Sequence, residues 1–142
     1  SSANAFALPG GFIFVSEPLI RLCGGDEDEI AFVLGHEMAH VTGGHVRDRM
    51  IADGFVDLAT RRLAGSGRLL RELIGKGYSR EQELEADREG AALAAAAGFD
   101  RDAAVRVLRR LGQELGDGDG LGVYFSSQPA FSERVRELGK RA

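Results

Sequence analysis

Apolar side chains recur at helical spacing along most of this chain, whereas only one short stretch has the composition of a strand. Residues 12–15 are aromatic or β-branched and follow a Pro-Gly-Gly turn, which is typical of a strand in a hairpin or at the edge of a small sheet. Residues 6–11 are expected to pass through that turn. The pattern therefore predicts an α+β fold that is mostly helical, with a small β-sheet.

Helix breakers and caps define the first two helices. Pro18 suits the first position of a short helix that reaches Cys23. The next helix is predicted from about residue 28 to residue 45 or slightly beyond, and two glycines at 43–44 weaken it near its end. The acidic residues 26–29 suit the positive end of this helix, so we interpret them as capping residues rather than as metal ligands.

Three more helices are predicted in the second half of the chain. Ser79 and Gln82 form a capping box that opens an alanine-rich helix, and Gly98 ends it. Its small side chains allow another helix to approach closely. Asp100 is expected to cap the next helix, which reaches about residue 115, and residues 132–138 form a last short helix.

Residues 51–77 give a weaker signal. Short amphipathic pieces are separated by small residues, and this part of the chain carries the basic residues Arg61, Arg62, Arg68, Arg71 and Lys76. The simpler interpretation is a helical hairpin with a solvated basic face. The alternative is a mobile lid or a membrane-surface contact.

Composition narrows the class of protein. A chain of 142 residues with 44% hydrophobic content is expected to form one domain with a real core. A net charge of -4 argues against a nucleic-acid partner. The single Cys23 cannot form an internal disulfide and suits a buried apolar position. No apolar run is long enough to span a membrane. Without an initiator Met or a signal peptide, we expect a processed form that lacks an N-terminal targeting or helical segment.

The most informative motif is His36-Glu37-x-x-His40, in the middle of the longest predicted helix. Positions four apart lie on one helical face, so His36 and His40 can bind one ion. Glu37 can then reach a water on that ion without binding the ion, which suits a general base beside zinc. Such a motif also arises by chance on amphipathic helices, but the apolar residues 30–35 indicate a helix that enters a core.

A catalytic zinc needs a third protein ligand, and His45 is one candidate. The glycine three residues after His40 resembles the metzincin pattern, in which a glycine turns the chain toward a third histidine. In that pattern the histidine comes six residues after the second one, whereas His45 comes five after His40. On a continuing helix it would also point about 180° away from His36. We therefore favour a supporting or structural role for His45.

Glu83, on the alanine-rich helix, is the stronger candidate for the third ligand. Asp87 follows it by four residues and shares its face, where it can accept a hydrogen bond from a zinc-bound histidine. Glu85 points elsewhere and is expected to be exposed to solvent.

Together these motifs resemble the HtpX-like and CAAX-prenyl-protease-like branch of the gluzincin zinc metallopeptidases. The resemblance covers nearly the whole chain and keeps the family's order: residues 4–11, the His36-Glu37-x-x-His40 helix, Ser79-Arg80 with Glu83-x-x-Ala86-Asp87, and Pro129 followed by Arg134. It implies a zincin-like metallopeptidase core in which His36, His40 and Glu83 hold one zinc ion, Glu37 is the general base and Asp87 orients a ligand.

The resemblance also implies a substrate and a place in the cell. An extended polypeptide would pair with the strand formed by Phe12, Ile13, Phe14 and Val15. Relatives of this kind are often bacterial envelope quality-control proteases, so we expect cleavage of unfolded or misfolded proteins in the cell envelope or periplasm.

Two departures from the family pattern leave alternatives open. Relatives commonly carry histidine before the proline of the last motif, where this chain has Gln128, and most relatives are longer or membrane-anchored. One alternative is a proteolytically latent, zinc-binding interaction domain, and another is a metzincin-like peptidase that uses His45. An additional donor to the oxyanion is expected, and the candidates are Tyr78, Tyr124, Gln128 and Arg134.

Overall fold

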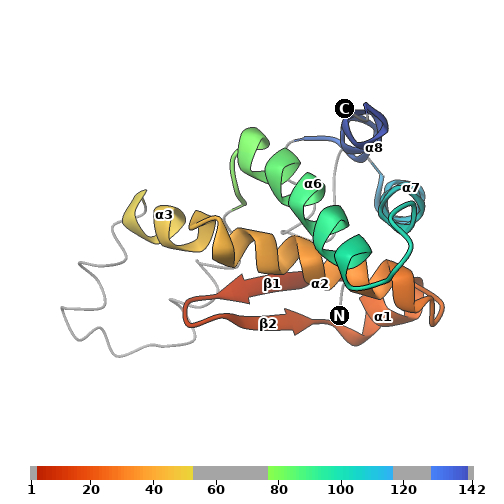
Figure 1. The fold of residues 1–142 in the computed structure, drawn as a ribbon, viewed down its shortest axis with the longest axis horizontal. Helices are drawn as coiled ribbons and strands as arrows, with labels where there is room; N and C mark the ends of the chain where they lie inside the picture. The colour runs from red at the N-terminus through yellow and green to blue at the C-terminus, as the bar shows by residue number, and fades with distance from the viewer. Residues whose placement is uncertain (1–2, 53–76, 117–128, 141–142) are drawn as a thin grey trace.

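The computed structural model describes residues 3–52, 77–116 and 129–140. It confirms a mostly helical fold with a small antiparallel sheet. In chain order the elements are β1 (Ala5–Leu8), β2 (Phe12–Val15), α1 (Glu17–Leu22), α2 (Glu27–Thr42), α3 (His45–Ala52), α6 (Arg80–Ala96), α7 (Ala103–Leu115) and α8 (Phe131–Gly139). Figure 1 shows α2 running through the middle, with the hairpin on one side and α6, α7 and α8 on the other.

The sheet is a hairpin, which confirms one of the two arrangements that the Pro-Gly-Gly turn suggests, but its first strand occupies residues expected to form the turn. β1 pairs antiparallel with β2, from Ala5 opposite Val15 to Leu8 opposite Phe12. The expectation that residues 6–11 only pass through a turn is therefore wrong for residues 6–8. All four residues of β1 are apolar, so the strand lacks the polar alternation that would reveal it, although burial alternates along it in the fold.

The helix α2 begins as predicted but ends early. The Asp26 carboxylate caps it by accepting hydrogen bonds from the backbone amides of Asp28 and Glu29. The helix ends at Thr42 instead of continuing past residue 45, and α3 starts at His45 as a separate helix. Gly44 has φ of +75°, a left-handed conformation that ends helices and that L side chains rarely adopt.

Two glycines set the close packing of α2 against α6. A Cβ added to Gly90 would lie 2.5 Å from the backbone nitrogen of His36, and one added to Gly35 would lie 2.6 Å from the Gly90 carbonyl oxygen. The two backbones therefore touch, which even the alanines of α6 would not allow. The predicted capping box is present at the start of α6, where Ser79 and Gln82 exchange hydrogen bonds.

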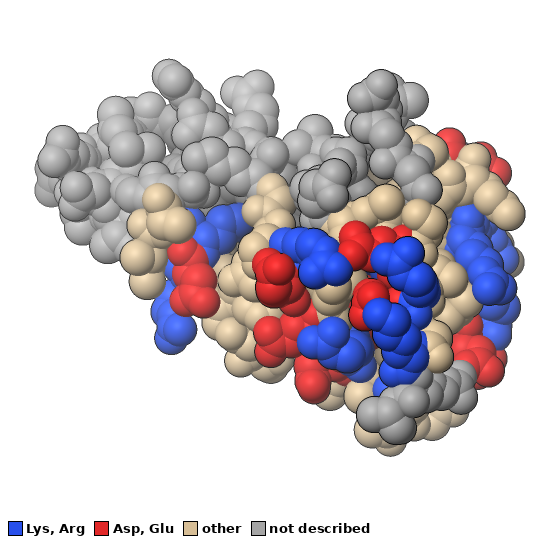
Figure 2. Space-filling view, turned by 90° about the horizontal axis from the view of Figure 1, so that it is seen from above, with Lys and Arg blue, Asp and Glu red and all other residues tan. Residues whose placement is uncertain are grey.

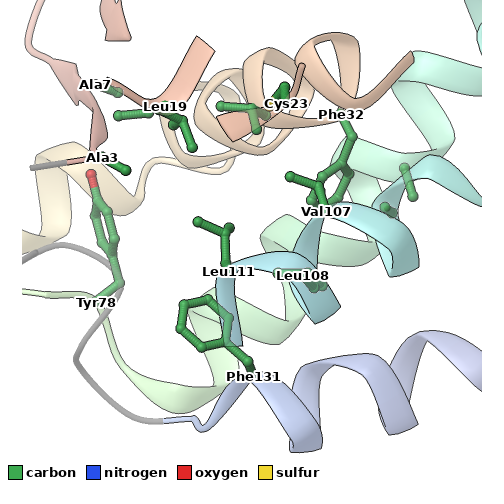
Figure 3. Packing of buried hydrophobic residues seen from close by; sticks show 14 of the residues in the cluster. Ala3, Ala7, Leu19, Cys23, Phe32, Tyr78, Val107, Leu108, Leu111 and Phe131 are labelled. Atoms are coloured by element: carbon green, nitrogen blue, oxygen red, sulfur yellow. The ribbon is translucent and has the colours of Figure 1, made fainter. Parts of the chain in front are cut away.

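The core lies between the hairpin side and the C-terminal helices. Figure 3 shows Leu108 and Leu111 of α7 packed near Phe131 of α8, with Phe32 and Leu19 toward the other side of the cluster.

Helix α7 begins at Ala103, so the prediction that Asp100 caps it is wrong. The Asp100 carboxylate instead accepts a hydrogen bond from the Asp102 amide, within the turn that precedes the helix. Cys23 is buried as predicted, and burial raises the pKa of its thiol to about 11.

The surface of the described residues carries charges of both signs. On the face in Figure 2, acidic and basic side chains are interspersed. Ion pairs among the described residues include Arg80 with Glu133 and Arg106 with Asp100. Among the described ranges, no helix is both long enough and apolar enough to cross a bilayer. Apart from residues 51–52 and 77, the predicted basic hairpin or lid at 51–77 lies outside the described residues.

Candidate metal centre

Three buried side chains converge where α2 meets α6. His36 and His40 project from one face of α2, and Glu83 comes from the first turn of α6. The Nε2 atoms of the two histidines lie 3.0 Å apart. Glu83 Oε2 lies 3.3 Å from His36 Nε2, and Glu83 Oε1 lies 3.6 Å from His40 Nε2. They are the two histidines of the helical motif and the carboxylate that the sequence favours over His45 as the third ligand.

The donor set fits a tetrahedral zinc ion with one position left open. Two ligand atoms that are each about 2.05 Å from such an ion are roughly 3.3 Å apart, and His36 Nε2 lies close to that distance both from His40 Nε2 and from Glu83 Oε2. Glu83 Oε1 is buried and has no hydrogen-bond partner within the described part of the chain, as expected of an oxygen placed to bind a cation. Two imidazoles and one carboxylate are also a known ligand set of catalytic zinc.

Asp87 orients His36 through the ring nitrogen on the side away from the other donors. His36 Nδ1 lies 2.9 Å from Asp87 Oδ1, so the nitrogen that faces away from Glu83 has a carboxylate partner. Arg134 of α8 in turn donates to both oxygens of Asp87, from Nε at 2.8 Å and from Nη2 at 2.6 Å. All three side chains are buried. Sequence reasoning offered Arg134 only as an oxyanion donor, because a spacing of 47 residues gives no sign of its pairing with Asp87.

The charges of this cluster favour one added positive charge. Burial alone lowers the pKa of His36, but hydrogen bonds with Asp87 and Glu83 outweigh burial and raise that pKa to about 10. For Asp87, burial raises the pKa, but the Arg134 guanidinium outweighs it and lowers the pKa to about 2. Burial and the neighbouring His36 hold the pKa of His40 well below its usual range. Without an ion, these charges favour a second proton on the His36 ring, and a metal cation would supply that positive charge instead.

The second histidine, His40, is enclosed by residues that follow the helix break. Its Nδ1 lies 3.0 Å from Nδ1 of His45, which is itself buried. The ring of Tyr78 stacks on the His40 ring at a centroid distance of 3.7 Å, and the guanidinium of Arg49 lies over the far side of the stack, 4.3 Å from the Tyr78 ring centre. His45 is therefore not one of the three converging donors, and Arg49 is a neighbour that the sequence did not reveal.

The other residues predicted to belong to the site are not among the three converging donors. Glu37 is fully buried in α2 and lies, with His36 and Arg134, around a small internal gap lined by apolar side chains. Phe12 and Phe14 of β2 are 64% and 48% exposed, and within the described residues β2 pairs only with β1. Tyr124 and Gln128 lie outside the described residues.

Comparison with known proteins gives the family. Residues 1–142 match the model of peptidase family M48. The chain is 35% identical to mitochondrial metalloendopeptidase OMA1 of Schizosaccharomyces pombe, over 95% of this chain and 42% of that protein. It is 31% identical to a putative beta-barrel assembly-enhancing protease of Vibrio cholerae, over 98% of this chain and 32% of that protein.

A third relative is protease HtpX of Xylella fastidiosa, 28% identical over 95% of this chain and 62% of that protein. The chain thus spans less than two thirds of each of these relatives. The resemblance to HtpX-like peptidases is confirmed at the level of the family, because one family model covers the whole chain: it belongs to peptidase family M48.

Proposed function

We propose that this chain is the catalytic domain of a zinc-dependent metalloendopeptidase that binds one zinc ion. The observation that carries the proposal is the buried His36, His40 and Glu83 cluster, whose donor separations suit a tetrahedral ion with an open fourth position. Structural zinc sites usually close with four protein ligands, mostly cysteine, and the single Cys23 of this chain lies elsewhere in the core.

The residues of the chain then divide the work of peptide hydrolysis. Zinc, when bound, polarises the scissile carbonyl and makes water more acidic. Glu37 takes a proton from the attacking water and passes it to the leaving amine. Asp87 holds the His36 ring in one orientation and tautomer. Because the Arg134 guanidinium is already bonded to Asp87, we assign Arg134 to orienting the site and keep Tyr78, Tyr124 and Gln128 as candidate oxyanion donors.

We further propose an extended polypeptide as the substrate. The β2 strand is one edge of a two-stranded sheet, and a peptide can add to such an edge through backbone hydrogen bonds, with Phe12 and Phe14 offering apolar contacts. Unfolded or misfolded proteins present such segments, which suits a quality-control role. The name of the Vibrio cholerae relative, which refers to beta-barrel assembly, supports a location in the cell envelope, whereas the OMA1 relatives are named as mitochondrial.

The test is cleavage of casein by the zinc-loaded chain, with zinc content and circular dichroism measured on the same sample. The unmodified protein should cleave, and both Glu37→Gln with zinc bound and a chelated sample should not. Full turnover by zinc-bound Glu37→Gln would refute the assigned base. A folded chain that holds zinc but cleaves nothing would instead support the latent interaction domain.

The identity of the third ligand is tested by zinc affinity. Glu83→Ala should lose most of the affinity, because it removes a donor from the cluster. His45→Ala should keep far more of it. The opposite order would support the metzincin-like alternative.

A further inference from the structure

We propose that His45 is a positioning residue that fixes the tautomer and orientation of His40, and that Glu85 in turn orients His45. This inference rests on the proposed function, since it assigns a role toward the zinc ion that His36, His40 and Glu83 would hold. It gives each histidine ligand its own carboxylate on α6. His36 contacts Asp87 directly, and His40 reaches Glu85 through His45.

The contacts of the two His40 nitrogens indicate which nitrogen would bind the ion and which would carry the proton. His40 Nε2 faces the other donors, 3.0 Å from His36 Nε2 and 3.6 Å from Glu83 Oε1. An imidazole that binds a metal through Nε2 keeps its proton on Nδ1. That Nδ1 lies 3.0 Å from His45 Nδ1, so the His40 N–H donates and the His45 nitrogen accepts.

Accepting at Nδ1 determines the tautomer of His45. A neutral imidazole that accepts at Nδ1 carries its proton on Nε2. His45 Nε2 lies 3.4 Å from Glu85 Oε2, so a carboxylate lies beside the nitrogen that carries the proton. Glu85 is 53% exposed, as the sequence predicts, and it lies between Glu83 and Asp87 in the sequence of α6. The relay thus consists of a hydrogen bond from His40 to His45 and a longer electrostatic contact from His45 to Glu85.

The break after α2 is what brings His45 to this position. On a continuing helix the side chain five residues after His40 would face away from it. Instead α2 ends at Thr42, and Gly44 adopts φ of +75° before α3 begins. Gly43 also leaves space for the ring, because a Cβ there would lie 2.9 Å from His45 Nε2. The two glycines thus allow the chain to turn so that the His45 ring lies against the His40 ring.

Variants at position 45 separate positioning from packing. His45→Ala removes the acceptor, whereas the side-chain oxygen of His45→Asn can occupy the place of Nδ1 and accept the same hydrogen bond. We expect His45→Ala to weaken zinc binding 10- to 100-fold, as is typical when the partner of a ligating histidine is removed. His45→Asn should recover most of that loss. Zinc affinity is measured by competition with a chelator, and the Co²⁺ absorption spectrum of each variant reports the ligand geometry.

The second half of the relay has a matched control on the same helix. Glu85→Gln should weaken zinc binding several-fold, whereas Glu81→Gln, which removes an exposed charge of the same kind one turn earlier, should leave it unchanged. Equal zinc affinity in His45→Ala and the unmodified protein would overturn the inference. So would a His45→Asn variant as weak as His45→Ala, which would indicate a direct ligand or a packing role.

A measurement on the unmodified protein covers the case in which His45→Ala does not fold. Nitrogen-15 NMR of the zinc-loaded chain should show His40 protonated at Nδ1 and His45 protonated at Nε2, and any other pair of tautomers would refute the relay. Failure of the proposed function is distinguishable. If the chain holds zinc with these tautomers but cleaves no peptide, the relay is supported and the proposed peptidase function is refuted. If the enzyme is active and His45→Ala does not change its zinc affinity, the proposed function is supported and the relay is refuted.

Discussion

Adding one methyl group at Gly90 should force apart the two helices that carry the metal donors. The added Cβ would lie 2.5 Å from the His36 nitrogen, and ordinary contact starts at 3.4 Å, so the gap must open by about 0.9 Å. The contact is with backbone, which cannot move aside by changing rotamer. Overpacking of this kind lowers the free energy of unfolding by roughly 3 kcal/mol, and the better helix propensity of alanine offsets about 1 kcal/mol of that loss. The net loss is about 2 kcal/mol.

Thermal unfolding of the metal-free chain measures this effect. A loss of about 2 kcal/mol corresponds to a fall of roughly 8 °C in Tm for a domain of this size. Because a site tolerates displacements of only about 0.5 Å, Gly90→Ala should also weaken zinc binding more than tenfold.

Two other helical glycines provide a graded control. At Gly112 the added Cβ would lie 3.2 Å from Phe131 Cβ, and at Gly139 it would meet nothing within 4 Å. Gly112→Ala should therefore cost less than Gly90→Ala, and Gly139→Ala should be neutral or stabilising. A Gly90→Ala variant that is as stable as Gly139→Ala and binds zinc as tightly would refute the close approach of the two helices.

Four further outcomes are expected. Asp87→Asn removes the closest charge partner of the buried Arg134 and leaves it the Glu83 carboxylate at 3.9 Å, so it should lower the free energy of unfolding by about 3 kcal/mol in denaturant titrations and weaken zinc binding 10- to 100-fold in chelator competition. In the metal-free chain, the lowered pKa of Asp87 stabilises the fold above its ordinary pKa of 3.8, and this stability should be lost as pH falls through about 2. The raised pKa of His36 acts oppositely: its stabilisation is full below pH 6.5 and should be lost as pH rises through about 10, which Tm measured across pH would show. Chelating the zinc should lower stability by about 4 kcal/mol relative to a sample at 1,000 times Kd, and an unchanged Tm would contradict metal binding at this site.

The parts of the site that depend on local periodicity were predictable from the sequence. Positions four apart on a helix must share a face, so the pairs His36 and His40, and Glu83 and Asp87, could be placed without a structure. The capping box at Ser79 depends on residues three apart and was equally accessible.

What could not be predicted depends on contacts distant in sequence or on small local energies. Arg134 finds Asp87 only through the packing of α8, and no spacing encodes that. The helix break at Gly43 and Gly44 depends on a helix propensity that is about 1 kcal/mol less favourable for each glycine than for alanine. Tertiary packing can outweigh a difference of that size in either direction. The strand β1 was missed because its buried positions are alanines among other apolar residues, and only pairing with β2 distinguishes it.

The bond between Arg134 and Asp87 also has a consequence for the order of synthesis. A ribosome makes α2 and α6 well before α8, so a nascent chain can present both histidines and Glu83 while Asp87 still lacks the guanidinium that holds it. Tight zinc binding should therefore wait until α8 has emerged and packed. On the proposed function, peptide cleavage would likewise stay weak until α8 is in place.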